Sequence, residues 1–274
     1  MPGKSKSRWG AVTAELSARI RQEQPLIHHI TNFVVMNDTA NATLAVGASP
    51  VMAHAKEEVA DLAAGAGALV LNPGTLEPAW VEAMLAAGKR ANRTGVPIIY
   101  DPVGVGATPY RSKTGRQFLK TLRFAVIRGN SGEIGALSGF GGAVRGVDSA
   151  AGVDDPEHVT AALAKRARTV AVLTGKRDIL SDGLRVLGVD NGHPMLQTIT
   201  GSGCMVTTVI AAFCAVESDF LAAAAAGLAY YGLAAQIAGR KAKGPGSFRT
   251  ALLDALYLMT PAQIEAGVRI TVLR

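Results

Sequence analysis

The chain has 274 residues, of which 49% are hydrophobic, 18% charged and 5% aromatic. Its mean hydropathy of +0.23 provides for a sizeable core and excludes a disordered protein. The scarcity of aromatic side chains argues against a stacking surface for single-stranded nucleic acid. The formal net charge of +7 fits either a solvated basic surface or attraction for an anionic ligand, such as a nucleotide or a nucleic acid.

The first residues of the chain differ in composition from the rest. Residues 1–10 are basic, with Lys4, Lys6 and Arg8, and contain no apolar run of the kind found in a secretory signal. They are predicted to form a flexible basic tail. No linker, repeat or low-complexity tract follows, so residues 11–274 are predicted to form a single domain.

A dense polar cluster comes next in the chain. It begins at His28 and His29, includes Asn32, and continues through residues 34–41. Such a cluster can line a small-molecule pocket. Equally, Asn37 or Asp38 can cap a following helix.

Four short apolar runs alternate with segments of helical pattern. The runs cover residues 68–71, 96–100, 124–127 and 170–173. Residues 78–93 are an example of the helical pattern between them, because their apolar side chains fall on one face. This alternation predicts an α/β fold with a central, mostly parallel sheet and helices on both faces.

Polar residues stand where these predicted strands end. They are Asn72, Asp101, Arg128 and Thr174. Ligands of parallel sheets bind beyond the carboxyl ends of the strands, so these residues are the first indication of a functional site.

Two carboxylates lie close to neighbouring strand ends. Asp101 follows the second apolar run, and Glu133 follows the third after a short turn. A pair in these positions suits a Mg²⁺ ion held through waters, with phosphates completing its coordination.

A glycine-rich turn leads into a long apolar segment. Thr200-Gly-Ser-Gly-Cys204 precedes the predicted helix that begins near Met205. Two glycines at a helix start let backbone N–H groups converge on an anion. In the first turn the helix dipole would favour the thiolate form of Cys204. The alternative is a tight turn that carries a small buried cysteine.

The last third of the chain is rich in alanine and predicted to be helical over residues 205–238, with Asp219 capping a second helix. The stretch of residues 220–235 is shorter than the roughly 20 residues of a membrane span, so we expect a buried helix and no membrane. Cys204 and Cys214 would lie about 15 Å apart on one helix, too far for a disulfide. A reducing, cytoplasmic location is therefore expected.

Several common site motifs do not occur in the sequence. Neither G-x-x-x-x-G-K-[ST] nor G-x-G-x-x-G is found, which disfavours a P-loop NTPase and a standard dinucleotide fold. Zinc-type spacing of cysteine and histidine and the G-x-S-x-G turn of serine hydrolases do not occur either.

Taken together, the motifs resemble those of hydroxyethylthiazole kinases, enzymes of thiamine salvage in the ribokinase-like superfamily. The resemblance runs from about Pro25 to at least Ala238. It is carried by His29-Ile-Thr-Asn32, Gly47-Ala-Ser-Pro-Val-Met52, Asp101-Pro-Val-Gly-Val-Gly-Ala-Thr108 with Tyr110-Arg111, Arg128-Gly-Asn-x-x-Glu133 and Thr200-Gly-Ser-Gly-Cys204.

The resemblance implies a ribokinase-like fold and Mg²⁺- and ATP-dependent phosphorylation of 4-methyl-5-(2-hydroxyethyl)thiazole to its monophosphate. It also implies a homotrimer with active sites at subunit interfaces. No nucleic-acid partner is expected. The implied residue roles are substrate binding by Met52, Gly201 and Asn32, ATP binding by Arg128 and Thr174, metal and phosphate binding by Asp101 and Glu133, and catalysis by Cys204. Residues 201–204 would form the anion hole, where most ribokinase-like kinases have an aspartate base in place of Cys204.

The sequence departs from the family pattern at Lys176, where a glutamate is usual; a lysine there could reach a phosphate or simply face solvent. Other readings of the chain are a ribokinase-like kinase for another small alcohol, a nucleotide-dependent repair dehydratase of the same fold, and a non-catalytic nucleotide-binding protein. The cluster from His28 to Asn41 and the cysteine at position 204 favour the thiazole kinase over the first two. The complete set of Asp101, Glu133 and residues 201–204 favours it over the third.

Overall fold

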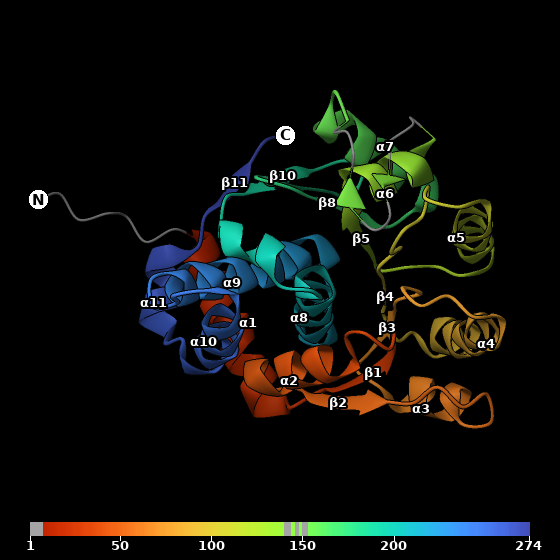
Figure 1. Cartoon of the computed structure of the whole chain (residues 1–274), viewed down its shortest axis with the longest axis horizontal. Coiled ribbons are helices and arrows are strands. Elements are labelled where there is room, and N and C mark those ends of the chain that lie inside the picture. The colour runs from red at the N-terminus through yellow and green to blue at the C-terminus, as the bar shows by residue number, and fades with distance from the viewer. Residues whose placement is uncertain (1–7, 140–143, 146–147, 150–152) are drawn as a thin grey trace, which may run out of the picture.

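The computed structural model describes residues 8–139, 144–145, 148–149 and 153–274 (Figure 1). Its helices are α1 (Arg8–Glu23), α2 (Met36–Val46), α3 (Val59–Gly65), α4 (Pro78–Thr94), α5 (Pro109–Thr121), α6 (Ser131–Ser138), α7 (Pro156–Ala167), α8 (Ser202–Val216), α9 (Phe220–Gly239), α10 (Pro245–Leu258) and α11 (Pro261–Gly267), with a 3-10 turn η1 at Pro194–Thr198. Its strands are β1 (Leu26–Ile30), β2 (Ser49–Met52), β3 (Ala68–Leu71), β4 (Ile98–Tyr100), β5 (Val126–Asn130), β6 (Val144–Arg145), β7 (Asp148–Ser149), β8 (Val170–Thr174), β9 (Asp178–Ser181), β10 (Val186–Val189) and β11 (Ile270–Val272).

Within the described residues, nine strands form one sheet in the order β11-β10-β9-β8-β5-β4-β3-β1-β2, and β6 pairs with β7 separately. The six strands from β8 to β2 in this order are parallel to one another. β9, β10 and β11 continue the sheet in antiparallel pairing. The predicted mostly parallel sheet is confirmed.

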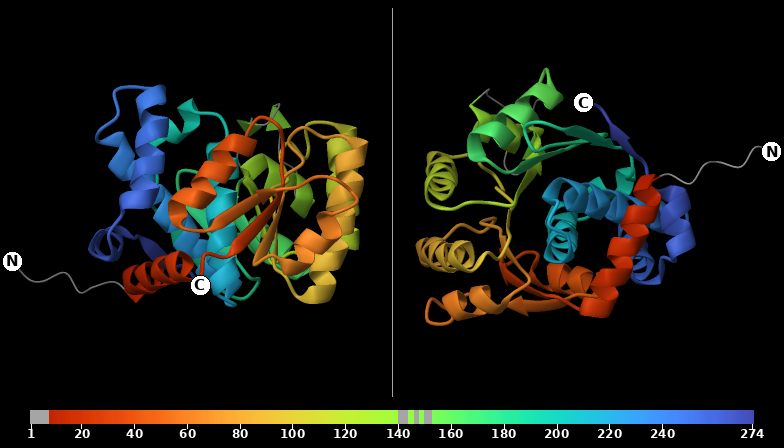
Figure 2. Two further views of the ribbon diagram at one scale, coloured as in Figure 1. Left: turned by 90° about the horizontal axis from the view of Figure 1, so that it is seen from below. Right: turned by 180° about the vertical axis from the view of Figure 1, so that it is seen from behind.

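Helices cover both faces of the sheet, as the two views in Figure 2 show. Strand β3 makes the division clear: Ala68 and Val70 face the core that includes α1, α2, α8, α9 and α10. Leu69 and Leu71 face the core that includes α3 to α7. Because alternate side chains of a strand point to opposite faces, a strand buried on both sides reads as an unbroken apolar run.

The alanine-rich helix α9 lies inside the first core. Among the described helices it alone is long and apolar enough to cross a membrane, yet 78% of the relevant window is buried within the protein. Ala223, Ala224, Ala225 and Ala226 are each 0% exposed, and Gly227 lets α9 pack closely against α8, because a Cβ there would lie 3.1 Å from the Cα of Ile210. Asp219 accepts hydrogen bonds from the N–H groups of Leu221 and Ala222 at 3.2 Å, which confirms the predicted cap.

The predicted segments are confirmed with shifted ends. The run 96–100 pairs as a strand only from Ile98, since Pro97 has no N–H to donate. The run 124–127 becomes β5, which continues to Asn130 because residues 128–130 pair with β8. Residues 8–10 of the predicted tail instead open α1, and residues 1–7 lie outside the described part of the chain.

The start of α2 differs from the capping interpretation. Val35 occupies the cap position, and its side chain makes no capping hydrogen bond to the N–H groups of the first turn. Asp38 is 6% exposed and accepts a hydrogen bond from the Nε of Arg249 at 2.8 Å. A carboxylate buried to this extent needs a charged partner, so Asp38 ties α2 to α10 rather than capping a helix.

Candidate active site

Side chains from six parallel strands form one row at the carboxyl edge of the sheet. In the order β8, β5, β4, β3, β1 and β2, they are Thr174, Arg128, Asp101, Asn72, Asn32 and Met52. Helix α8 starts beside the middle of this row, where the Sγ of Cys204 meets Asn72. The fold therefore gathers residues that are far apart in the sequence.

Asp101 is the most enclosed charged group of the row, at 0% exposed. Its Oδ2 accepts hydrogen bonds from the Nδ2 of Asn72 and the Oγ1 of Thr207, both at 3.0 Å. Its Oδ1 is buried and has no hydrogen-bond partner, and the Nη1 of Arg128 stands 3.7 Å away. Burial raises the pKa of Asp101, while Arg128, Thr207, Cys204 and Asn72 oppose that rise.

Arg128 spans the gap between Asp101 and Thr174. Its Nη2 donates to the Oγ1 of Thr174 at 2.8 Å, and that hydroxyl donates to the carbonyl of Gly129 at 3.2 Å. The guanidinium is thus held at a fixed place on the edge of the sheet, with its Nε buried and unpaired.

Two glycines shape the start of α8. Gly201 has a φ of +77°, and a Cβ there would lie 2.7 Å from the Cγ1 of Val35. A Cβ on Gly203 would lie 2.6 Å from the Nη1 of Arg128. The first N–H groups of a helix have no intrahelical partner, so an anion bound there would meet both these groups and the nearby Arg128.

Cys204 lies in the first turn of α8, and two amides contact its sulfur. The Nδ2 of Asn72 is 3.1 Å from Sγ and the Nδ2 of Asn32 is 3.8 Å from it. Burial, with the negative charge of Asp101 next, raises the pKa of Cys204 to about 12. The expected thiolate is therefore not favoured, because desolvation outweighs the helix dipole.

Glu133 is held by the backbone. Its Oε1 accepts from the N–H of Gly104 at 2.8 Å and its Oε2 from the N–H of Asn130 at 2.9 Å, which completes a capping box at the start of α6. Burial and the charge of Asp101 raise its pKa to about 7. Glu133 thus fastens the loop after β4 to α6.

The donor set fits a Mg²⁺ ion that is held mainly by its phosphates. The Oδ1 of Asp101 is a carboxylate oxygen inside the site that accepts no hydrogen bond, and the described residues contain no group of three or more acidic, histidine or cysteine side chains that would hold a metal alone. Proteins commonly bind Mg²⁺ through one or two carboxylates, substrate phosphates and waters. Asp101 fits the direct position, and Glu133 fits contact through water.

The polar cluster near the N-terminus is divided by the fold. His28 and His29 lie in β1 and are 0% exposed; their Nε2 atoms bond to the carbonyl of Ala53 at 3.0 Å and the Oγ1 of Thr43 at 3.3 Å. Burial lowers the pKa of both, to about 3 for His29. They are neutral core residues, and Asn32 is the member of the cluster that contacts the row.

Two residues of the site were given no role by the sequence. Asn72 was recognised only as a polar strand end, and Thr207 was not singled out. Thr207 stands one helical turn after Cys204 in a mostly apolar helix, so it is on the same face. A hydroxyl at that spacing was the available signal.

Two cavities in the described part of the chain bear on where a ligand could bind. One, of about 390 Å³, adjoins Thr174 and is lined in part by Gly175, Lys176, Arg177 and Ile179. This cavity continues from the row past β8, and both Thr174 and Lys176 line it.

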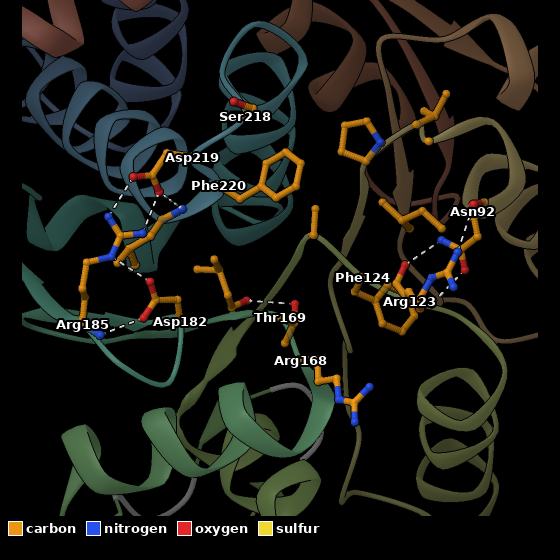
Figure 3. A pocket seen from close by; sticks show the side chains of 17 residues that line it. Asn92, Arg123, Phe124, Arg168, Thr169, Asp182, Arg185, Ser218, Asp219 and Phe220 are labelled. Atoms are coloured by element: carbon orange, nitrogen blue, oxygen red, sulfur yellow. Dashed lines mark hydrogen bonds and ion pairs between the residues drawn. The ribbon is translucent and has the colours of Figure 1, made fainter.

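The other cavity, of about 560 Å³, lies at the opposite edge, against residues 96–98, 123–125 and 168–170 (Figure 3). There Arg185 bridges Asp182 and Asp219, each at 2.7 Å. Because these charges pair with one another and parallel sheets bind ligands at their carboxyl edge, the row and not this cavity is the candidate site.

Comparison with known proteins places the chain among small-molecule kinases. The sequence model described as the Hydroxyethylthiazole kinase family matches residues 17–262. A hydroxyethylthiazole kinase of Desulforudis audaxviator is 63% identical over 95% of this chain and 96% of its own length. The structure of a hydroxyethylthiazole kinase protein from Pyrococcus horikoshii superposes with a TM-score of 0.87 at 40% identity, covering 96% of this chain and 99% of that one.

A ribokinase-like superfamily protein from Enterococcus faecalis shares the fold alone. Its TM-score is 0.59 at 13% identity, over 90% of this chain and 81% of that one. The predicted ribokinase-like architecture is confirmed.

The raised pKa of Cys204 predicts slow alkylation. At pH 8 a thiol with a pKa of about 12 holds far less thiolate than a free cysteine with its pKa near 8.5, so native Cys204 should react with iodoacetamide at least about a hundredfold more slowly. The rate should still be rising at pH 10. Cys204→Ala isolates the contribution of Cys214, and the urea-unfolded chain gives the free-thiol rate. A native rate that levels off below pH 8 would show a thiolate and contradict the burial argument.

Proposed function

This chain belongs to the hydroxyethylthiazole kinase family, and we propose from its geometry how each residue of the row contributes to phosphoryl transfer. The reaction joins ATP and the hydroxyl of 4-methyl-5-(2-hydroxyethyl)thiazole to give ADP and the thiazole monophosphate, a step of thiamine salvage. The observation that carries the assignment of roles is the cluster of Arg128, Asp101 and Cys204 around the glycine-rich start of α8.

The nucleotide is assigned to the side of the row near β5 and β8. Arg128, fixed between Asp101 and Thr174, would bind phosphate oxygens together with the N–H groups at the start of α8. The cavity beside Thr174 provides a place for the adenosine, and there Lys176 would lie near the nucleotide. Positioning and charge neutralisation are most of what phosphoryl transfer requires.

Asp101 and Glu133 are the residues proposed to hold Mg²⁺, which when bound would neutralise charge on the β- and γ-phosphates. The Oδ1 of Asp101 is the available direct ligand. Glu133, whose oxygens already accept two backbone N–H groups, would act through water.

The thiazole is assigned to the other side of the row, near β1 and β2. Asn32, Met52 and Gly201 stand there, and the lack of a side chain on Gly201 lets the start of α8 lie close to Val35 on this side. The substrate hydroxyl would lie at Cys204, between the thiazole side and the phosphate side.

Because Cys204 is protonated, it is proposed to orient the hydroxyl rather than attack phosphorus. The hydroxyl oxygen bonds to the γ-phosphorus, and the bond from that phosphorus to the bridging oxygen breaks, so the electron pair leaves with ADP. The hydroxyl proton is released late and can pass to the sulfur as the thiol proton passes to Asp101, its hydrogen-bond partner.

A homotrimer with interface active sites is also proposed. Phe33 and Val34 directly follow Asn32, and each is 60% exposed. Large apolar side chains exposed beside a binding row are typical of a surface covered by another chain. A cytoplasmic location remains a proposal of the same kind, based on the two free cysteines.

Turnover tests the substrate. ATP and Mg²⁺ should release ADP with hydroxyethylthiazole and not without an alcohol or with a panel of other small alcohols. Cys204→Ala should lower kcat by about a hundredfold, the lower end of the range for a group that handles the substrate proton, and leave ATP binding intact. Release of ADP only with another alcohol would contradict the substrate, and loss of nucleotide binding in Cys204→Ala would contradict its role.

Sedimentation tests the assembly. The native protein should sediment as three chains of 28.3 kDa each, and Phe33→Glu should shift it towards smaller species because a buried interface charge is costly. Leu184→Glu is the matched control, since Leu184 is 82% exposed in the turn between β9 and β10. A monomeric native protein, or equal effects of the two substitutions, would overturn the proposal.

A further inference from the structure

The carboxamide of Asn72 makes contacts with both sides of the candidate site. Asn72 is 1% exposed and lies directly after β3, at the centre of the row. Its Nδ2 donates to the Oδ2 of Asp101 at 3.0 Å and to the Sγ of Cys204 at 3.1 Å. Its Oδ1 accepts from the N–H of Gly74 at 3.0 Å and from the Nδ2 of Asn32 at 2.9 Å. Two donors and two acceptors are the full capacity of an amide.

The orientation of this amide follows from its neighbours. The backbone N–H of Gly74 can only donate, so the atom that faces it is the oxygen of Asn72. The nitrogen is then fixed toward Asp101 and Cys204. An exchange of the two amide atoms would leave two donors facing one another at Gly74, and it would set an oxygen against the carboxylate of Asp101.

The two ends of the amide serve different purposes. The bond from Gly74 closes a turn after the strand, a task for which a serine hydroxyl is also suited. The nitrogen end has no part in that turn. It joins the group assigned to the phosphates with the group assigned to the alcohol, through two hydrogen atoms on one rigid plane.

We propose that Asn72 is a positioning residue for phosphoryl transfer, whose Nδ2 sets the Asp101 carboxylate and the Cys204 sulfur at one fixed separation. The inference rests on the proposed function, because it assigns the two groups to the two reactants. Misplacement by about 1 Å can cost on the order of a hundredfold in rate, so a single shared donor is an effective constraint. Since Asn72 would touch neither reactant, its loss should affect the reaction step more than binding.

Asn72→Ser and Asn72→Ala separate the two ends of the amide. The serine keeps an acceptor for the turn but has no donor that reaches both partners, whereas the alanine loses both functions. Each variant should lower kcat by about ten- to a hundredfold and change the KM values for ATP and thiazole by less than about threefold. Only Asn72→Ala should also lower the midpoint of thermal unfolding markedly.

Asn191→Ala is the matched control. Asn191 is 5% exposed and makes three bonds away from the row, to Gln236, Gly267 and the N–H of Arg269 at 3.0, 2.9 and 2.7 Å. Its loss should lower the unfolding midpoint and leave kcat unchanged.

A double-mutant cycle distinguishes positioning from a general structural role. If Asn72 acts in part through Cys204, the fall in kcat caused by Asn72→Ser should be clearly smaller in a Cys204→Ala background than in the native one. Equal falls in both backgrounds, or a native kcat in Asn72→Ser, would overturn the inference while native turnover of thiazole upholds the function. Absence of native turnover would overturn both.

Discussion

The buried carboxylate of Asp101 is the group on which the rest of the site depends. An ionised carboxylate without exposure costs several kcal/mol unless partners compensate it. Here Asn72 after β3, Arg128 in β5 and Thr207 in α8 supply a hydrogen bond, a positive charge and a second hydrogen bond. Compensation is incomplete, since Oδ1 accepts no hydrogen bond and the Arg128 guanidinium stands 3.7 Å from it. One carboxylate oxygen is thus available to a cation, and residues from three elements of the fold offset the cost of burying its charge.

The two cores keep these partners in place. Five of the six strands that carry a residue of the row, β1, β3, β4, β5 and β8, contribute side chains to both cores, so most of the carboxyl edge is built on rigid elements rather than on a long loop. Sites carried by such elements hold side chains more accurately than loops do. The start of α8 reaches the same edge because Gly201 and Gly203 permit close approach to Val35 and Arg128. Side chains at either glycine would move the helix or the guanidinium away.

The sequence was sufficient to predict which residues form the row at the carboxyl edge, but not their hydrogen bonds or their pKa shifts. Asn72, Asp101, Arg128 and Thr174 could be found because apolar runs mark the strands, and parallel strands end at one edge. Thr207 and the hydrogen bonds of Asn72 depend on which strands are neighbours, and this order cannot be read along the chain. Cys204 shows the same limit: its position in a first turn suggested a thiolate, whereas burial and Asp101 raise its pKa. His28 and His29 looked like pocket residues, and only packing shows that they are core.

The turnover of Asp101→Asn tests the central claim most directly. The substitution keeps the shape of the side chain and removes its charge, so the protein should still fold, but with a lower unfolding midpoint, because Arg128 loses the negative charge with which it is paired. If the carboxylate organises phosphates and alcohol, kcat should fall by about a thousandfold, as for loss of a major electrostatic contact in a water-poor site. A folded variant with kcat within tenfold of the native value would contradict the account.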